Sequence, residues 1–297
     1  MIILFYPVFS QNAFNFGQLT IGNGLSSGSI TCVLQDSEGF IWIGTEDGLN
    51  KYDGYEIIIY RHNPQLLNSI GGNSVRCLFE DSRNNLWIGL KGDGMCRLDL
   101  KTGQFTSFRH NKTNENSISY NDVSGIVEDK QGKLWIAVDR GGLDMFDPVA
   151  GTFVHYPILD RRFNHSLNDA LTDITLDRHG NIWLSSWGGG VYCFDVKDKN
   201  FLVHPYWEQE KTDENVCKHI YSLYTDEKDI LWVSSTHGGL YSLNEAEKEY
   251  KQYTVCDKPN ECITTRSVQS VCKDENGNLW VASINEGVNI INEKNGL

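Results

Sequence analysis

The feature that most constrains the fold of this 297-residue chain is a motif that occurs six times, in which an Asp is followed six residues later by a Trp. Successive tryptophans of the motif lie 45, 48, 48, 49 and 48 residues apart. A repeat of this period with only β-strand signals is typical of a β-propeller, in which each repeat forms one blade. The chain is therefore predicted to be an all-β propeller of four-stranded antiparallel blades. The six pairs are Asp36 and Trp42, Asp81 and Trp87, Asp129 and Trp135, Asp177 and Trp183, Asp226 and Trp232, and Asp274 and Trp280.

The third repeat predicts the layout of one blade. Its pattern indicates an inner strand a over residues 122–128, strand b over 134–138, strand c over 142–147 and strand d over 152–156. In the a-to-b turn, Asp129 can accept hydrogen bonds from backbone amides and Gly132 can take a positive φ. We therefore predict that the repeat Asp is structural and that the repeat Trp packs between neighbouring sheets.

The connections between strands divide between two faces of the propeller. Because the strands of a blade alternate in direction, the d-to-a loops and b-to-c turns emerge on one face, and the a-to-b and c-to-d turns on the other. The d-to-a loops are long and differ between repeats, and binding residues concentrate on such loops of a rigid scaffold. These loops span residues 63–73, 111–121, 159–169, 208–218 and 256–266.

The b-to-c turns carry the candidate ligand-binding residues. At the fourth and fifth positions after the repeat Trp the side chains differ from blade to blade, while the flanking residues repeat. A ring of such side chains around the axis suits a carbohydrate, because an aromatic ring packs on the C–H face of a sugar and charged groups bond to its hydroxyls. Drift of the turn tips explains the pattern equally well. Trp187 is the strongest single candidate, because it is an additional Trp in a polar turn. Trp207, in contrast, is expected to cover an edge. The predicted set is Glu46, Asp47, Lys91, Asp139, Arg140, Trp187, Thr236, His237 and Asn285.

Charge and motif content narrow the function classes. The net charge of −13 opposes binding to nucleic acid or to an anionic membrane surface. The sequence has no GxSxG, HExxH or phosphate-binding glycine motif, and no spacing of Cys and His that predicts a metal site. We therefore predict no catalytic residue, no metal and no cofactor. An enzymatic role would require His237 to meet Glu46 or Glu286 at the axis.

The N-terminal residues 1–10 resemble a truncated signal peptide. They are uncharged and largely apolar and end in a sequence similar to a signal-peptidase site, although the basic residues that usually begin a secretory signal are missing. We therefore expect export, with the mature chain beginning at Gln11 and residues 11–297 forming the propeller domain.

Seven of the eight cysteines fall into two kinds. Cys256 and Cys262 bracket one loop and are placed for a local disulfide, without the sequence deciding whether it forms. Other cysteines occupy strand positions in separate blades and are expected to act as small buried side chains. These are Cys32, Cys77, Cys96, Cys193 and Cys272.

The repeat resembles the two-component regulator propeller repeat. Its pattern reads V-x-x-I-x-x-D-x-x-G-x-L-W-I-G-T-x-x-G-G-L-x-x-Y-D followed by F-x-x-Y, and the best copy spans residues 30–53. Residues 16–25 are also similar to the segment that begins the first propeller of such sensors. The resemblance covers nearly the whole chain from Phe14 onward.

The resemblance implies a function in signalling. It implies a periplasmic domain that binds an oligosaccharide released from a polysaccharide and passes the event to an inner-membrane histidine kinase, which regulates polysaccharide-utilisation genes. The implied partners are the oligosaccharide and the rest of the sensor, namely a second propeller, a β-sandwich domain and the kinase, with a homodimer left open. The alternatives are a carbohydrate-active or lyase-type propeller enzyme and a protein-interaction propeller of the WD type.

The number of repeats in this chain differs from the number of blades in the propellers of this family. Its propellers have seven blades, whereas this chain has six repeats. Residues 14–21 could supply a lone strand d that completes the sixth blade and closes a six-bladed ring. Otherwise the chain forms an incomplete seven-bladed ring. Six repeats in place of seven favour the interpretation that the chain is the N-terminal fragment of a sensor.

Overall fold

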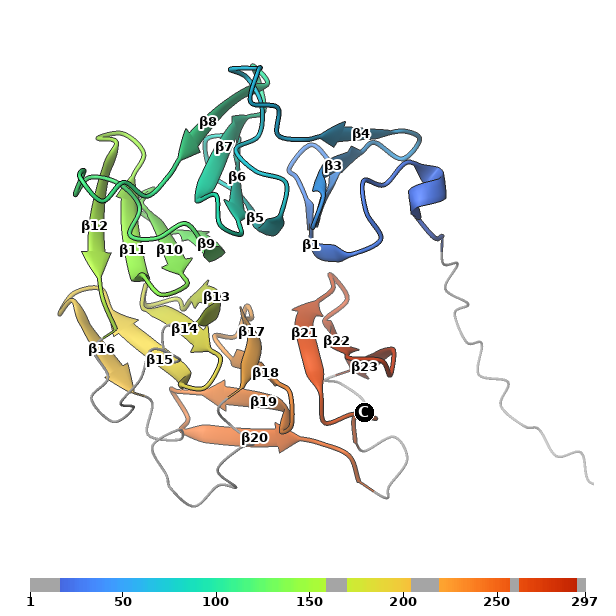
Figure 1. The fold of residues 1–297 in the computed structure, drawn as a ribbon. Helices are drawn as coiled ribbons and strands as arrows, with labels where there is room; N and C mark the ends of the chain where they lie inside the picture. The colour runs from blue at the N-terminus through green and yellow to red at the C-terminus, as the bar shows by residue number, and fades with distance from the viewer. Residues whose placement is uncertain (1–16, 159–169, 204–218, 257–261, 293–297) are drawn as a thin grey trace, which may run out of the picture.

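The chain folds into a β-propeller with six blades arranged in a ring (Figure 1). The computed structural model describes residues 17–158, 170–203, 219–256 and 262–292. Each blade is an antiparallel sheet whose strands follow one another in chain order, and the first strand of each blade lies toward the centre of the ring. This architecture confirms the predicted fold class.

Five blades have four strands, and the described part of the sixth has three. Blade 1 comprises β1 (Ile30–Gln35), β2 (Ile41–Thr45), β3 (Gly48–Tyr52) and β4 (Ile57–Tyr60), and blade 2 comprises β5 (Val75–Glu80), β6 (Asn85–Leu90), β7 (Met95–Asp99) and β8 (Gln104–Phe108). Blade 3 comprises β9 (Val123–Glu128), β10 (Leu134–Val138), β11 (Gly142–Asp147) and β12 (Thr152–Tyr156), and blade 4 comprises β13 (Leu171–Leu176), β14 (Ile182–Ser186), β15 (Gly190–Asp195) and β16 (Asn200–Val203). Blade 5 comprises β17 (Ile220–Thr225), β18 (Leu231–Ser235), β19 (Gly239–Asn244) and β20 (Glu249–Tyr253), and blade 6 comprises β21 (Val268–Lys273), β22 (Asn278–Ser283) and β23 (Val288–Asn292).

The strands of blade 3 agree with those predicted from the sequence. Strands b, c and d coincide with β10, β11 and β12, and strand a begins at Val123, one residue later than expected. A short 3-10 helix, η1 (Ile21–Asn23), precedes blade 1. No helix among the described residues has the length and apolarity needed to cross a bilayer.

A side-chain hydrogen bond joins the Asp and Trp of every repeat. The indole Nε1 of the Trp donates to Oδ2 of the Asp, at distances from 2.7 Å for Trp42 and Asp36 to 3.3 Å for Trp232 and Asp226. Oδ1 of the same Asp accepts the backbone N–H four residues later, as Phe40 donates to Asp36 at 2.8 Å. The Asp therefore closes the a-to-b turn and anchors the Trp, which confirms its predicted structural role and explains the constant six-residue spacing.

Five buried clusters hold consecutive blades together. In each of them the repeat Trp of one blade packs on the following blade. Trp87 of blade 2, for example, lies with Val123 and Ile136 of blade 3. The repeat Trp side chains of blades 1 to 5 are at most 4% exposed, which confirms their predicted place in the core.

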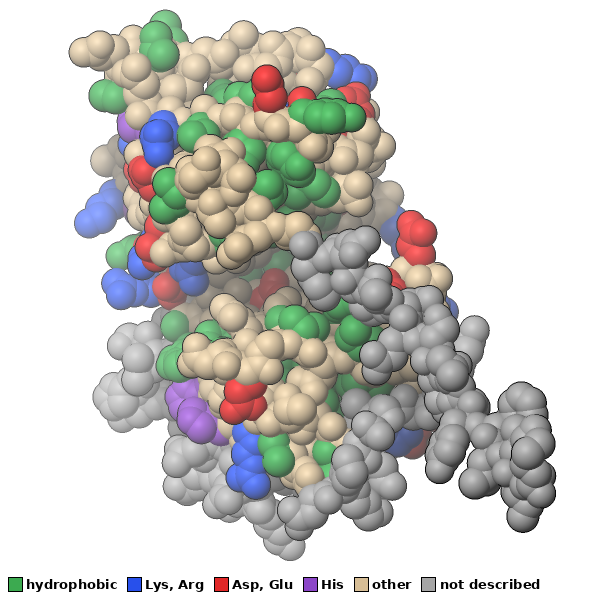
Figure 2. Space-filling model, turned by 90° about the vertical axis from the view of Figure 1, so that its right-hand side faces the viewer, with side chains coloured by type: hydrophobic (Ala, Val, Ile, Leu, Met, Phe, Trp, Pro, Cys, Tyr) green, Lys and Arg blue, Asp and Glu red, His purple; other side chains and the backbone are tan. Residues whose placement is uncertain are grey.

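One face of blade 1 and one face of blade 6 lack such a cluster in the part of the chain that the structure describes. Val33 of β1 is 60% exposed, although the equivalent Ile126 and Ile174 are buried against the preceding blade. In blade 6, Val288 of β23 is 56% exposed and Trp280 is only half-buried. Figure 2 views this side of the molecule and shows hydrophobic side chains above and below a hollow.

One of the two alternatives for the ring is not seen among the described residues. Residues 17–20 form no strand and Ile21 begins η1, so this part of the possible closing strand does not pair with β23, while residues 14–16 lie outside the described residues. One cysteine prediction is wrong. Cys272 is exposed, because the equivalent Phe79 and Tyr224 pack on a following blade that Cys272 does not meet. The other strand cysteines agree better with expectation. Cys96 and Cys193 are buried, and Cys32 and Cys77 are half-buried against inter-blade clusters.

Candidate functional site

The b-to-c turns and the d-to-a loops lie on the same face, as predicted. In every blade the residue four positions after the Trp donates its backbone N–H to the residue just before the inner strand, as Glu46 donates to Ser29 and Trp187 to Ala170. The turns also reach the following loop, because Gly48 donates to Asn73 and Gly94 to Asn121. The predicted side chains are thus held at equivalent places around the mouth of the ring. The equivalent donors in the remaining blades are Lys91, Asp139, Thr236 and Ile284.

Trp187 belongs to a cluster of aromatic rings at the junction of blades 4 and 5. Its side chain is 37% exposed, and its ring lies 4.8 Å from that of His219 and 5.1 Å from that of Tyr221, centroid to centroid. The His237 ring lies 6.2 Å from the His219 ring. The backbones of Trp187 and His219 form an antiparallel bridge, which fixes the turn of blade 4 against the start of β17.

The polar atoms of this cluster are unevenly satisfied. Thr236 Oγ1 and His237 Nδ1 share a hydrogen bond of 2.6 Å, and Thr236 itself is buried. Nδ1 of His219 is buried without a hydrogen-bond partner among the described residues. A buried, unsatisfied ring nitrogen is costly and is available to a polar ligand group.

Sequence reasoning missed His219 and Tyr221. Both lie at the start of the inner strand, where the other repeats also carry different side chains, such as Arg76 in blade 2 and Thr172 in blade 4. The comparison that selected the b-to-c turns would have found these positions if it had been extended to the inner strands.

The remaining predicted residues lie in ion pairs or are exposed. Arg76 Nη1 lies 3.8 Å from Oδ2 of Asp139, which joins blades 2 and 3 on this face, and Arg140 beside it is exposed with φ of 64°. Asp47 pairs with Arg61 at 2.9 Å. Lys91, Glu46 and Asn285 are exposed. Among the described residues, only Trp187, Thr236 and His237 of the predicted set are linked at one junction, by ring contacts through His219 and by a hydrogen bond.

A carboxylate lies at the same junction of blades 4 and 5. Asp173 of β13 accepts the backbone N–H of Ile174 at 2.8 Å and that of Leu223 in β17 at 3.0 Å. Burial outweighs these hydrogen bonds and raises the pKa of Asp173 to about 7. The junction therefore holds a carboxyl group that changes its charge near neutral pH.

The loop before blade 6 is closed by a disulfide between Cys256 and Cys262, whose Cα atoms lie 5.7 Å apart. The local bridge suggested by the spacing is thus present. The long loops 159–169 and 208–218, Trp207 and the expected signal peptide lie outside the described residues.

The described residues contain no group of His, Cys, Asp or Glu side chains arranged to hold a metal ion. Among the described residues, His237 is hydrogen-bonded to Thr236, and no hydrogen bond or ion pair joins it to Glu46 or Glu286. The cluster offers an aromatic surface with imidazole donors and acceptors.

Comparison with known proteins finds similarity in four of the six repeats. A family model described as two component regulator propeller matches residues 24–47, 69–92, 117–140 and 263–285. A curated relative, histidine kinase P4 of Formosa agariphila, is 47% identical over 62 residues, which is 20% of this chain and 4% of that protein.

Solved structures agree on the fold. The extracellular domain of a protein assigned as a one component system from B. thetaiotaomicron is 21% identical with a TM-score of 0.73, over 94% of this chain and 38% of that chain. The extracellular domain of a hybrid two component system from the same organism is 22% identical with a TM-score of 0.58, over 92% and 41%. A virginiamycin B lyase from Staphylococcus aureus is 13% identical with a TM-score of 0.68, over 91% and 82%. The chain thus spans about two fifths of the two extracellular domains, and at these identities the likeness concerns the fold alone.

Proposed function

We propose that this chain is the ligand-binding part of a sensor protein that acts outside the cytoplasm, because four of its segments match the two component regulator propeller model. Its propeller resembles the extracellular domains of a hybrid two component system and of a one component system. We further propose a periplasmic location, an oligosaccharide derived from a polysaccharide as the ligand, and polysaccharide-utilisation genes as the regulated output. A histidine kinase is the proposed output enzyme, the class named for the relative from Formosa agariphila.

The observation that carries the proposal is the exposed Trp187 ring beside His219, Tyr221 and His237. A sugar ring presents an apolar C–H face that packs on an indole, and its hydroxyls need donors and acceptors at the edge of that contact. Nδ1 of His219, which has no hydrogen-bond partner among the described residues, and the exposed His237 ring supply them. Fold similarity alone supports the enzymatic alternative, a carbohydrate-active or lyase-type propeller.

Isothermal titration calorimetry against a panel of neutral and acidic oligosaccharides tests the proposal. For the glycan that binds, Trp187→Ala should weaken the affinity by about tenfold or more, because it removes a stacking surface worth about 1–3 kcal/mol. Tyr55→Ala is the matched control, since Tyr55 is a 93% exposed aromatic residue in the c-to-d turn of blade 1, on the other face. Equal affinity of wild type and Trp187→Ala, with both proteins folded, would exclude this cluster as the sugar site.

Arg140→Ala tests how far the ligand extends from the cluster. Arg140 is exposed in the equivalent turn of blade 3, so an oligosaccharide that spans the mouth of the ring should lose affinity in this variant as well. Loss of affinity in Trp187→Ala but not in Arg140→Ala would confine the ligand to the junction of blades 4 and 5.

A further inference from the structure

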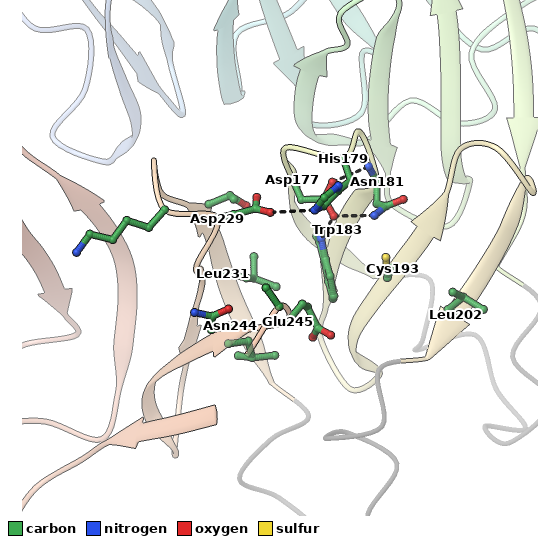
Figure 3. Close-up of a pocket in the computed structure, with 14 residues that line it drawn as sticks. Asp177, His179, Asn181, Trp183, Cys193, Leu202, Asp229, Leu231, Asn244 and Glu245 are labelled. Atoms are coloured by element: carbon green, nitrogen blue, oxygen red, sulfur yellow. Dashed lines mark hydrogen bonds and ion pairs between the residues drawn. The ribbon is translucent and has the colours of Figure 1, made fainter. Parts of the chain in front are cut away.

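A pocket of about 420 Å³ opens between blades 4 and 5 on the face of the a-to-b turns, opposite the long loops (Figure 3). Trp183 and Cys193 of blade 4 face Leu231 and Glu245 of blade 5 across it. Its apolar walls include Leu231 and Leu243, which are buried. The pocket is therefore an amphipathic hollow, separate from the aromatic cluster described above.

Carboxylates dominate the charged groups that line this pocket. Asp177, Asp229 and Glu245 contribute acidic side chains, and Lys228 contributes a basic one. His179 lies at the rim, with its Nε2 3.7 Å from Oδ2 of Asp229. With a neutral His179 the lining carries a formal charge of −2, from three carboxylates and one ammonium group.

At the next junction, between blades 5 and 6, a side chain of the protein itself fills the place equivalent to this pocket. The residue before the repeat Asp is Lys273 in blade 6, and its side chain is only 4% exposed. Its Nζ lies 3.3 Å from Oδ2 of Asp226, the oxygen that accepts the Trp232 indole, and 2.8 Å from Oε1 of Glu227. A primary ammonium on an alkyl chain thus packs against the Asp–Trp pair between blades 5 and 6.

Blade 1 shows a second ammonium group over the same motif. Lys51 lies opposite Trp42 in the pairing of β2 with β3, and its Nζ is 3.5 Å from the centroid of the Phe40 ring and 5.3 Å from that of Trp42. A cation over an aromatic face is attracted by the ring quadrupole. In two of the six repeats, a lysine of the chain therefore lies beside the Asp–Trp pair or over the Trp ring.

Blade 4 has neither lysine. The residue opposite Trp183 is Cys193, and the residue equivalent to Lys273 is Thr225, which accepts a hydrogen bond from Thr175 at 3.2 Å. Burial raises the pKa of the Cys193 thiol to about 12, so it remains neutral. Cys193 thus stands where blade 1 places Lys51, and Thr225 stands where blade 6 places Lys273, although blades 2 and 3 place Glu80 and Glu128 at the position of Thr225. Two short, uncharged side chains therefore leave a hollow at this junction.

We propose that this pocket binds a primary alkylammonium group, which takes the place that Lys273 occupies in the next junction. The alkyl chain packs on Leu231, Leu243 and the edge of Trp183. The ammonium lies among the carboxylates of Asp177 and Asp229, where desolvated charge pairing is stronger than in water. The group can belong to a free amine or to a lysine side chain of a partner protein.

Calorimetric titration with hexylamine tests the proposal, with hexan-1-ol and hexanoate as neutral and anionic probes of similar length. We expect hexylamine to bind about tenfold or more tightly than hexan-1-ol, because only the amine can pair with the carboxylates. Hexanoate should not bind. Equal binding of hexylamine and hexan-1-ol would overturn the proposal, since it would indicate an apolar hollow without charge selection.

Two variants locate the amine. Thr225→Lys places the native lysine of the next junction in this pocket and should abolish hexylamine binding in a folded protein. Asp229→Asn should weaken it by about tenfold through loss of a paired charge, whereas Glu38→Gln, an exposed acidic residue in the a-to-b turn of blade 1, should leave it unchanged. Unchanged hexylamine affinity in Thr225→Lys would contradict the site.

Two more measurements separate the sources of the amine and the two sites of this protein. A blocked lysine peptide that competes with hexylamine would indicate that a protein side chain can enter, whereas binding of 1,5-diaminopentane without peptide binding would restrict the site to free amines. Trp187→Ala should leave hexylamine binding unchanged, because Trp187 lies on the opposite face. Parallel loss of glycan and amine binding would contradict two independent sites.

Discussion

At the scale of single residues, each repeat Asp has a separate task for each carboxylate oxygen. Oδ1 organises the backbone of the turn and Oδ2 accepts the buried indole N–H of the Trp. The same hydrogen bonds, led by those from Trp280 and Asn278, lower the pKa of Asp274 to about 2. Removing the Asp would leave a buried donor without an acceptor, which is a costly change.

Asp81→Ala should therefore lower the free energy of unfolding by about 2–4 kcal/mol, through loss of the acceptor for Trp87 and of the turn hydrogen bonds. Asp93→Ala is the control, because Asp93 forms a partly exposed ion pair with Arg109 at 2.9 Å and should cost about 1 kcal/mol or less. Urea unfolding followed by tryptophan fluorescence measures both. A cost for Asp81→Ala no larger than that of Asp93→Ala would contradict the anchoring role of the repeat Asp.

Asp173 makes stability depend on pH in a predictable direction. Its pKa of about 7 in the folded chain exceeds the ordinary value of 3.8, so the folded state keeps a proton that the unfolded state loses above that value. The stability contribution of this group therefore falls as the pH rises from about 4 to about 7 and is constant above. In urea unfolding at pH 5 and pH 8, wild type should lose about 2–3 kcal/mol more than Asp173→Asn over this interval. The same loss in both proteins would contradict the raised pKa.

At the scale of elements, the strands of a blade could be predicted because each turn between them has a local chemical signature. Asp129 and Gly132 mark one turn and the Gly residues after strand b mark the next, so β10, β11 and β12 were predicted with correct bounds. Whether residues 17–21 form a closing strand could not be decided from the sequence, because they have the alternation of a strand while pairing depends on a partner distant in the sequence.

The b-to-c turn of blade 2 separates two reasons for a glycine. Gly92 and Gly94 both have positive φ, of 84° and 78°, but a Cβ on Gly94 would lie 2.2 Å from the carbonyl oxygen of Phe108, while a Cβ on Gly92 would meet no atom within 4 Å. Gly92→Ala should cost about 1 kcal/mol for the backbone conformation. Gly94→Ala should cost about 2 kcal/mol more, because strand c cannot then approach strand d. Thermal unfolding of the two variants measures the difference, and equal midpoints would show that the close approach is relaxed without cost.

At the scale of the whole molecule, the sequence predicted the face on which the candidate site lies better than it predicted the residues that form the site. The division into a face of short turns and a face of long loops follows from strand alternation alone and is present in the structure. Which turn residues meet depends on packing between blades, and this is why the ring contacts of Trp187 with His219 and Tyr221 had no signal within one repeat. The pocket beside Trp183 likewise arises from two small residues, Cys193 and Thr225, that belong to different blades.

Whether a buried cluster covers a repeat Trp determines how much that Trp contributes to stability. Trp87 is fully buried between blades 2 and 3, whereas Trp280 keeps its hydrogen bond to Asp274 at 3.0 Å but lies on the face of blade 6 that no described cluster covers. Trp87→Ala should therefore cost about 3–5 kcal/mol of unfolding free energy, and Trp280→Ala about 1–2 kcal/mol. Urea unfolding at two protein concentrations measures both values. Equal costs that do not change with concentration would show that the face of blade 6 is covered within one molecule, and a cost for Trp280→Ala that grows with concentration would show that a second copy covers it.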